Sequence, residues 1–158
     1  MTERSRKMLN PLLLRFYFLA KLPLALMAGV KLRELDAEHA VAAVPYGWRS
    51  TNPFRSTYFA ALAMAAELST GAIALLAVEA APKPVAMLIV NMTAGFEKKA
   101  TSLAEFTCLD GAKLAAAVAR AVATGEPATA EAETVGRMAD GTVVARFTFT
   151  WSFKTRSR

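Results

Sequence analysis

Glu67 is the residue whose surroundings in this sequence most clearly indicate chemistry. It is the only charged side chain in the stretch from Ser56 to Val78, which is otherwise dominated by alanine and other apolar residues. An ionisable group in such a stretch is costly to bury, so it is a candidate functional residue. Burial also raises the pKa of a carboxylic acid toward the range in which it acts as a general base or as a nucleophile.

The start of the same stretch offers a second chemical feature, the N-terminus of a helix. Ser56 or Thr57 can cap this helix, and the N–H groups of its first turn favour negative charge on a substrate oxygen. Phe59 precedes Glu67 by ~12 Å along a helix that rises 1.5 Å per residue. A reacting carbonyl must lie within ~3 Å of both the acid and the N–H donor. One helix cannot supply both, but two antiparallel copies can, which predicts a dimer.

Each candidate also has a purely structural interpretation. Glu67 can be a buried acid that pairs with Arg49 or Arg55. Asn52 can organise a loop or the entry to the helix, and Tyr58 can line a pocket rather than act as an acid. These alternatives remain open on the sequence alone.

The composition restricts the class of protein. The chain has 158 residues, of which 54% are hydrophobic and 20% charged, with a mean hydropathy of +0.31. This excludes intrinsic disorder. One cysteine cannot form an internal disulfide, and with a single histidine we expect no metal site. The net charge of +6 is partly concentrated at the two ends, at Arg4, Arg6, Lys7, Lys154, Arg156 and Arg158. Without a nucleic-acid-binding motif beside it, we expect solubilising tails and no nucleic-acid partner.

Hydrophobic periodicity predicts an α+β fold. The expected order is a helical segment over 1–29, strands over 30–35 and 39–45, a long helix from about 56 to before Pro82, strands over 85–97 and 101–109, a helix from Asp110 to Gly125, and strands over 128–137 and 143–153. The first half of the 85–97 strand is apolar throughout, which predicts burial on both faces. A single hydrophobic helix in an otherwise antiparallel β chain predicts a sheet curled around that helix.

Two segments could meet a membrane. The stretch over 56–78 is long and apolar enough to span one, but its central Ser69 and Thr70 favour a buried core helix. The segment from Asn10 to Ala28 contains Arg15 and Lys21, so we do not expect it to span. It is predicted to be an amphipathic helix that packs on the domain or makes weak contact with a membrane surface.

The order of elements and the region around Glu67 resemble the hotdog-fold acyl-CoA thioesterases, and most closely an uncharacterised thioesterase-like branch of that superfamily. In the family, an Asn precedes a His-Gly-Gly motif and then an Asp or Glu at fixed spacing. Here Asn52 is followed at that spacing by Tyr58-Phe59-Ala60 and then by Glu67. The resemblance covers residues 30–153, within a single domain over 1–158.

The resemblance implies a cytoplasmic homodimer, or a dimer of such dimers, that hydrolyses an acyl thioester and needs no cofactor beyond CoA in its substrate. It implies Glu67 as general base or nucleophile, assisted by Asn52, the Phe59 backbone N–H and Tyr58. The expected substrate contacts are Ser56, Thr57, Ala60, Ala63, Met64, Gly71, Lys98 and Lys99, of which the two lysines form either a solvated turn or a contact to the CoA phosphates. The N-terminal segment would then cover an acyl tunnel or lie at a membrane surface.

The sequence departs from the family pattern where the substrate carbonyl would bind. Tyr58 stands in place of the histidine, and Phe59 and Ala60 in place of the glycines. Phe59 retains the backbone N–H that the first glycine offers, but its side chain can crowd the approach. The alternative function is therefore a non-catalytic acyl- or lipid-binding protein on the same fold.

Overall fold

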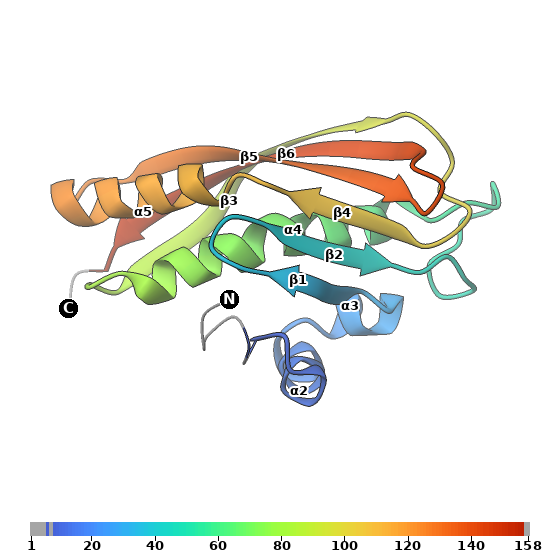
Figure 1. Ribbon diagram of the computed structural model, residues 1–158, viewed down its shortest axis with the longest axis horizontal. Coiled ribbons are helices and arrows are strands. Elements are labelled where there is room, and N and C mark those ends of the chain that lie inside the picture. The colour runs from blue at the N-terminus through green and yellow to red at the C-terminus, as the bar shows by residue number, and fades with distance from the viewer. Residues whose placement is uncertain (1–5, 7, 157–158) are drawn as a thin grey trace.

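A six-stranded antiparallel sheet curls around one long helix in the computed structural model, which describes residues 6 and 8–156 (Figure 1). Of the basic terminal residues, Arg4, Lys7 and Arg158 lie outside the described residues. The strands follow the order β1-β2-β4-β5-β6-β3 across the sheet. They are β1 (Lys31–Leu35), β2 (Ala40–Val44), β3 (Val85–Phe96), β4 (Ala104–Cys108), β5 (Ala128–Met138) and β6 (Val143–Thr155); the helices are α2 (Pro11–Lys21), α3 (Pro23–Ala28), α4 (Phe59–Ala80) and α5 (Gly111–Thr124).

Helix α4 lies in the concave face of the sheet, and its alanines allow close packing. Ala65, Ala66 and Ala74 are fully buried. The buried hydroxyl of Ser69 is satisfied, because it donates to the Ala66 carbonyl at 2.7 Å and shares a 2.8 Å hydrogen bond with Thr134 of β5. The predicted α+β hotdog architecture, with its helix enclosed by the sheet, is confirmed.

The interior position of α4 bears on the membrane-spanning alternative. By length and composition α4 could cross a membrane, but 61% of its most apolar window is buried inside the protein. The aromatic face of β6 covers part of it, with Phe147, Phe149, Trp151 and Phe153 buried in strict alternation, as the period of two predicts. The apolar character of α4 is thus accounted for by the core of this fold.

Strand β3 differs from its prediction. It pairs only with β6 and forms one edge of the sheet, and most of its side chains are exposed rather than buried on both faces. Leu88 is 66% exposed, and Val90, Met92 and Phe96 are also exposed. A continuous apolar run is compatible both with a central strand and with an edge strand whose outer face is apolar. The sequence pattern therefore could not distinguish these two positions in the sheet.

The N-terminal helical segment is broken into two helices. The Asn10 side chain caps α2 by accepting hydrogen bonds from the N–H groups of Leu12 and Leu13, at 3.1 and 3.3 Å. Leu22 leaves the helical conformation because Pro23 follows it, and Pro23 then starts α3. The predicted N-terminal helix is therefore present, but it turns at this proline (Figure 1).

The first residue of α5 sits directly against the turn between β1 and β2. The Gly111 N–H donates to the Glu38 carbonyl at 3.1 Å, and a Cβ placed on Gly111 would lie 2.0 Å from the Ala37 carbonyl oxygen. Because this neighbour is backbone, Gly111→Ala is expected to lower the free energy of unfolding by about 1–3 kcal/mol. Gly47→Ala is the control, since nothing lies within 4 Å of a Cβ there. Equal urea midpoints for the two variants would contradict the close approach.

Candidate functional site

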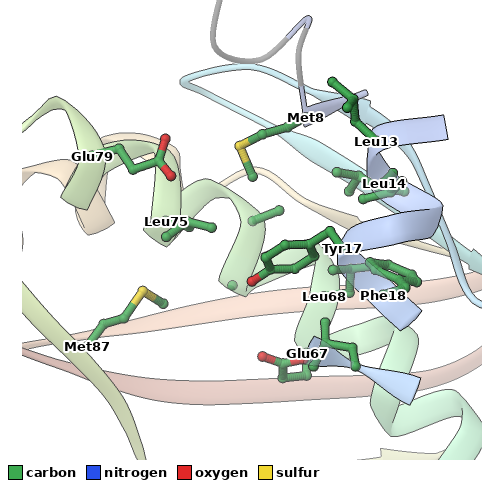
Figure 2. A pocket seen from close by; sticks show the side chains of 14 residues that line it. Met8, Leu13, Leu14, Tyr17, Phe18, Glu67, Leu68, Leu75, Glu79 and Met87 are labelled. Atoms are coloured by element: carbon green, nitrogen blue, oxygen red, sulfur yellow. The ribbon is translucent and has the colours of Figure 1, made fainter. Parts of the chain in front are cut away.

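A cavity of about 630 Å³ lies between α2 and α4 and reaches β1 at Leu32 and β3 at Met87 (Figure 2). Its lining is almost entirely apolar. The exceptions are the carboxylates of Glu67 and Glu79, both from α4, and the phenol of Tyr17 from α2. The remaining residues are Met8, Leu13, Leu14, Phe18, Leu22, Leu32, Leu68, Gly71, Ala72, Leu75 and Met87.

The Glu67 carboxylate faces this cavity without a partner. Within the described part of the chain, no residue forms an ion pair or a hydrogen bond with its carboxylate oxygens. In the same part of the chain, every side-chain oxygen or nitrogen that is completely inaccessible to solvent has a hydrogen-bond partner. These oxygens must therefore be accessible from the cavity rather than enclosed in the core. Burial of the half-buried side chain raises the pKa of Glu67 above its usual value of 4.5. The alternative pairing with Arg49 or Arg55 does not occur in this structure.

The Glu67 carboxylate lies close to Gly71, on the next turn of α4. A methyl group on Gly71 would lie 3.0 Å from Glu67 Oε1 and 3.2 Å from the Trp151 ring, so glycine leaves the space that the carboxylate occupies. The Trp151 Nε1–H donates to Thr70 Oγ1 at 3.1 Å, and the Thr70 hydroxyl donates to the Glu67 carbonyl at 3.1 Å. Helix α4 and strand β6 are thus fixed to each other beside the acid.

The raised pKa makes a prediction about stability. The folded protein holds a proton on Glu67 more tightly than the unfolded chain does, so stability falls as pH rises from 4.5 through the folded-state pKa. Glu67→Gln is therefore expected to be more stable than wild type at pH 7, and the difference should vanish well below pH 4.5. The difference in unfolding free energy between the two proteins is measured by urea unfolding across this pH range. Each unit by which folding raises the pKa corresponds to about 1.4 kcal/mol of that difference. A variant no more stable than wild type at pH 7 would contradict the desolvation.

Helix α4 begins one turn later than Ser56. Its N-cap is Tyr58, which makes no side-chain capping hydrogen bond. The prediction that Ser56 or Thr57 caps the helix is therefore wrong. Thr57 is occupied elsewhere, since its N–H and hydroxyl donate to the Ala100 carbonyl at 2.8 and 3.1 Å. Within the described chain the Phe59 N–H donates to no acceptor, so the first turn retains a free donor.

Asn52 organises the loop that leads into α4. Its side-chain oxygen accepts hydrogen bonds from the N–H groups of Phe54 at 2.9 Å and Ser56 at 3.2 Å, and its Nδ2 donates to Ser56 Oγ at 3.1 Å. All of these contacts are local, which agrees with the structural interpretation of Asn52. The aromatic rings of Tyr58 and Phe59 meet edge to face at 4.8 Å, and both are exposed.

The cavity brings together only two of the predicted site residues, Glu67 and Gly71. Ala60, Ala63 and Met64 lie on the same side of α4, half-buried, but toward its start and outside the cavity lining. Lys98 and Lys99 are exposed after β3, and the Lys99 Nζ donates to the Phe54 carbonyl at 3.1 Å. Among the described residues no three His, Cys, Asp or Glu side chains gather closely enough to hold a metal ion.

Sequence reasoning missed the part of the cavity that α2 contributes. Leu13, Leu14, Tyr17 and Phe18 line the cavity from one side of α2 (Figure 2). Their spacing of three and four residues marks one apolar helix face, in which Phe18 is buried while Leu13 and Tyr17 stay exposed, and nothing local shows which element that face meets. On α4, the spacing of four from Glu67 through Gly71 to Leu75 and Glu79 was the available signal for the far half of the cavity.

The antiparallel sheet that encloses α4 has the hotdog fold. The chain belongs to the family described as "Domain of unknown function (DUF4442)", whose model matches residues 12–153. This confirms the resemblance to an uncharacterised thioesterase-like branch. No curated protein matches the chain.

Solved structures share this fold. A protein of unknown function from Pseudomonas aeruginosa, described as a probable thioesterase, is 20% identical, with a TM-score of 0.78 over 95% of this chain and 99% of that one. A protein of unknown function from Chlorobaculum tepidum is 13% identical, with a TM-score of 0.77 over 90% and 93%. A thioesterase from Haemophilus influenzae is 11% identical, with a TM-score of 0.65 over 89% and 88%. At these identities the likeness establishes the fold.

Proposed function

We propose that this protein is a thioesterase that hydrolyses acyl-CoA or a related acyl thioester, with Glu67 acting across a dimer interface. The observation that carries the proposal is the Glu67 carboxylate, which faces an apolar cavity, has no partner among the described residues and has a pKa raised by burial. A raised pKa makes a carboxylate a stronger base, which suits proton transfer. The thioesterase names of the structural neighbours support the same class of reaction.

The reaction requires that a carboxylate and a hydrogen-bond donor to the carbonyl oxygen both contact the same thioester. As general base, Glu67 takes a proton from water while the water oxygen attacks the carbonyl carbon. The oxyanion that forms accepts a hydrogen bond from the Phe59 N–H of the partner subunit. The C–S bond then breaks, and the departing thiolate takes the proton from Glu67. As nucleophile, the Glu67 carboxylate would instead attack the carbonyl carbon, the C–S bond would break to release the thiolate, and water would hydrolyse the resulting acyl anhydride to free Glu67 and the carboxylic acid.

The exposed edge strand β3 supports the dimer. An edge strand presents unpaired N–H and C=O groups, and a long apolar edge favours pairing with another strand. Antiparallel pairing of β3 with its own copy across a two-fold axis would extend the sheet and place both α4 helices on one face. That arrangement would bring Glu67 of one chain to the Phe59 N–H of the other, two groups that lie ~12 Å apart within a single chain. Further association of such dimers is also compatible with the fold.

A charge on the β3 edge is expected to separate the subunits. Leu88→Lys should yield monomers and lower thioesterase activity at least tenfold, because each site needs both chains. Leu109→Lys is the control, since Leu109 is an exposed leucine outside β3. Sedimentation equilibrium together with turnover measures both effects. Dimeric and fully active Leu88→Lys would exclude β3 as the interface.

The cavity also restricts the acyl group. Its apolar lining fits a fatty or aromatic acyl chain better than a small polar one. Lys98 and Lys99 are exposed cations that could contact the CoA phosphates. The amide of Asn52 and the ring of Tyr58 would act indirectly, by shaping the entry to α4.

A non-catalytic acyl-binding protein is the second candidate function. The observation that favours it is the pair of aromatic side chains of Tyr58 and Phe59 at the start of α4, where the family pattern has a histidine and a glycine. A panel of acyl-CoA substrates from acetyl to palmitoyl and benzoyl tests the two functions. Release of free CoA supports the thioesterase. Retention of an acyl ligand on the purified protein, seen by native mass spectrometry without any turnover, would replace it with the binding protein.

A further inference from the structure

Helix α2 is apolar on two opposite sides, of which the cavity explains only one. Leu14 and Phe18 face inward (Figure 2). On the other side Leu12, Phe16 and Leu19 follow a spacing of four and three residues and form one stripe. Their side chains are 70%, 68% and 62% exposed.

Helix α3 carries a second apolar pair of the same kind. Leu24 and Met27 are spaced by three residues on α3 and are 67% and 66% exposed. We call these five residues of α2 and α3 the outer stripe. Exposed groups of large apolar side chains on soluble proteins mark candidate interaction sites, and each of these five side chains is more than 60% exposed.

The charged residues of α2 and α3 have one sign. From Pro11 to Ala28, the residues of these two helices and their turn, the sequence contains Arg15 and Lys21 and no acidic residue. Arg15 lies on α2 beside the outer stripe, between Leu12 and Leu19, and Lys21 ends the helix on the side opposite the stripe. An apolar helix face flanked by cations alone is the pattern of helices that lie at anionic lipid surfaces, where apolar side chains insert and lysine or arginine meets the headgroups.

We infer that α2 and α3 dock on the surface of a bilayer that contains anionic phospholipid, with the outer stripe inserted at the boundary between headgroups and acyl chains. A second copy of this chain fits the outer stripe less well. A two-fold contact of antiparallel α2 helices through the stripe would place Arg15 of each copy beside Arg15 of the other, because Arg15 lies next to the middle of the stripe. Docking does not depend on the proposed thioesterase activity, because it uses the side of α2 that points away from the cavity.

The test uses the full-length protein and two kinds of vesicle, phosphatidylcholine alone and phosphatidylcholine with 30% phosphatidylserine. Co-flotation with the anionic vesicles is expected, with at least tenfold weaker binding to the neutral ones and in 0.5 M NaCl. The triple variant Leu12→Gln, Phe16→Gln, Leu19→Gln should weaken binding to anionic vesicles at least tenfold. The double variant Arg15→Gln, Lys21→Gln should weaken it severalfold.

The matched control is Leu109→Gln with Lys154→Gln, which removes an exposed leucine and an exposed lysine outside α2 and α3. It should bind as wild type does. All replaced side chains are exposed, and unfolding midpoints verify that each variant folds. The inference is overturned if wild type does not bind anionic vesicles, or if the triple variant binds them as well as wild type does. A triple variant that changes only the oligomeric mass assigns the outer stripe to a second copy and overturns it as well.

Discussion

Glu67→Gln is expected to lower kcat for acyl-CoA hydrolysis by about 10²–10⁴-fold, the range that a positioned general base contributes. Glutamine keeps the size of the side chain and its fit beside Gly71 and Trp151, but it cannot take a proton from water. Because the same substitution removes a buried charge, the inactive variant should be more stable than wild type at pH 7. Loss of activity therefore cannot be attributed to unfolding.

The control for this substitution is Glu79→Gln, on the same helix and in the same cavity but ~18 Å farther along α4. Its kcat should stay within a few-fold of wild type. For wild type, kcat/KM should rise with pH through the raised pKa of Glu67, since only the carboxylate form is a base. Undiminished hydrolysis by Glu67→Gln would exclude this residue from the chemistry.

Phe59→Pro is expected to lower kcat by about 10²–10³-fold, the cost of losing one oxyanion donor. Proline lacks the N–H but suits the first position of a helix. Tyr58 already has the extended conformation, with ψ of 136°, that a residue before proline prefers. Phe59→Leu is the control, because it removes the ring and keeps the N–H. Similar losses in the two variants would assign the role to the ring and not to the backbone.

Combining the two substitutions tests whether the site is shared between subunits. In a heterodimer of Glu67→Gln and Phe59→Pro chains, one of the two shared sites has both defects and the other has an intact Glu67 and an intact Phe59 N–H. Heterodimers isolated with two different tags should therefore recover about half of wild-type activity. Recovery below 1% would show that acid and donor do not come from different chains.

The elements that the sequence predicts well are those whose side chains show clearly which faces are buried in the core. The alternation from Phe147 to Phe153 has a single apolar side, and the alanine-rich stretch around Glu67 has no side that suits water. Both patterns lead directly to a sheet around a helix. The strand over 85–97 could not be placed in the sheet because its apolar residues face outward at an edge, and periodicity does not report strand order.

The candidate site was predictable at Glu67 and Gly71 because both lie on one helix, where spacing fixes which residues share a face. Tyr17 and Met87 come from elements distant in sequence, so only the fold brings them to the cavity. Asn52 illustrates the opposite difficulty. Its position matches the family pattern, but its amide is engaged by Phe54 and Ser56. Only such atomic contacts can show whether this asparagine organises a loop or takes part in a reaction.

The turn at Leu22 and Pro23 has a consequence for how specificity can evolve in this family. Helix α2 lines the cavity yet contributes no strand to the sheet, no residue to the start of α4 and no part of the β3 edge. In the proposed thioesterase, substitutions at Leu13 or Tyr17 are therefore expected to change which acyl chain is accepted without moving Glu67 or Phe59. The α2 half of the cavity can diversify separately, whereas the α4 half shares its helix with the proposed reacting groups.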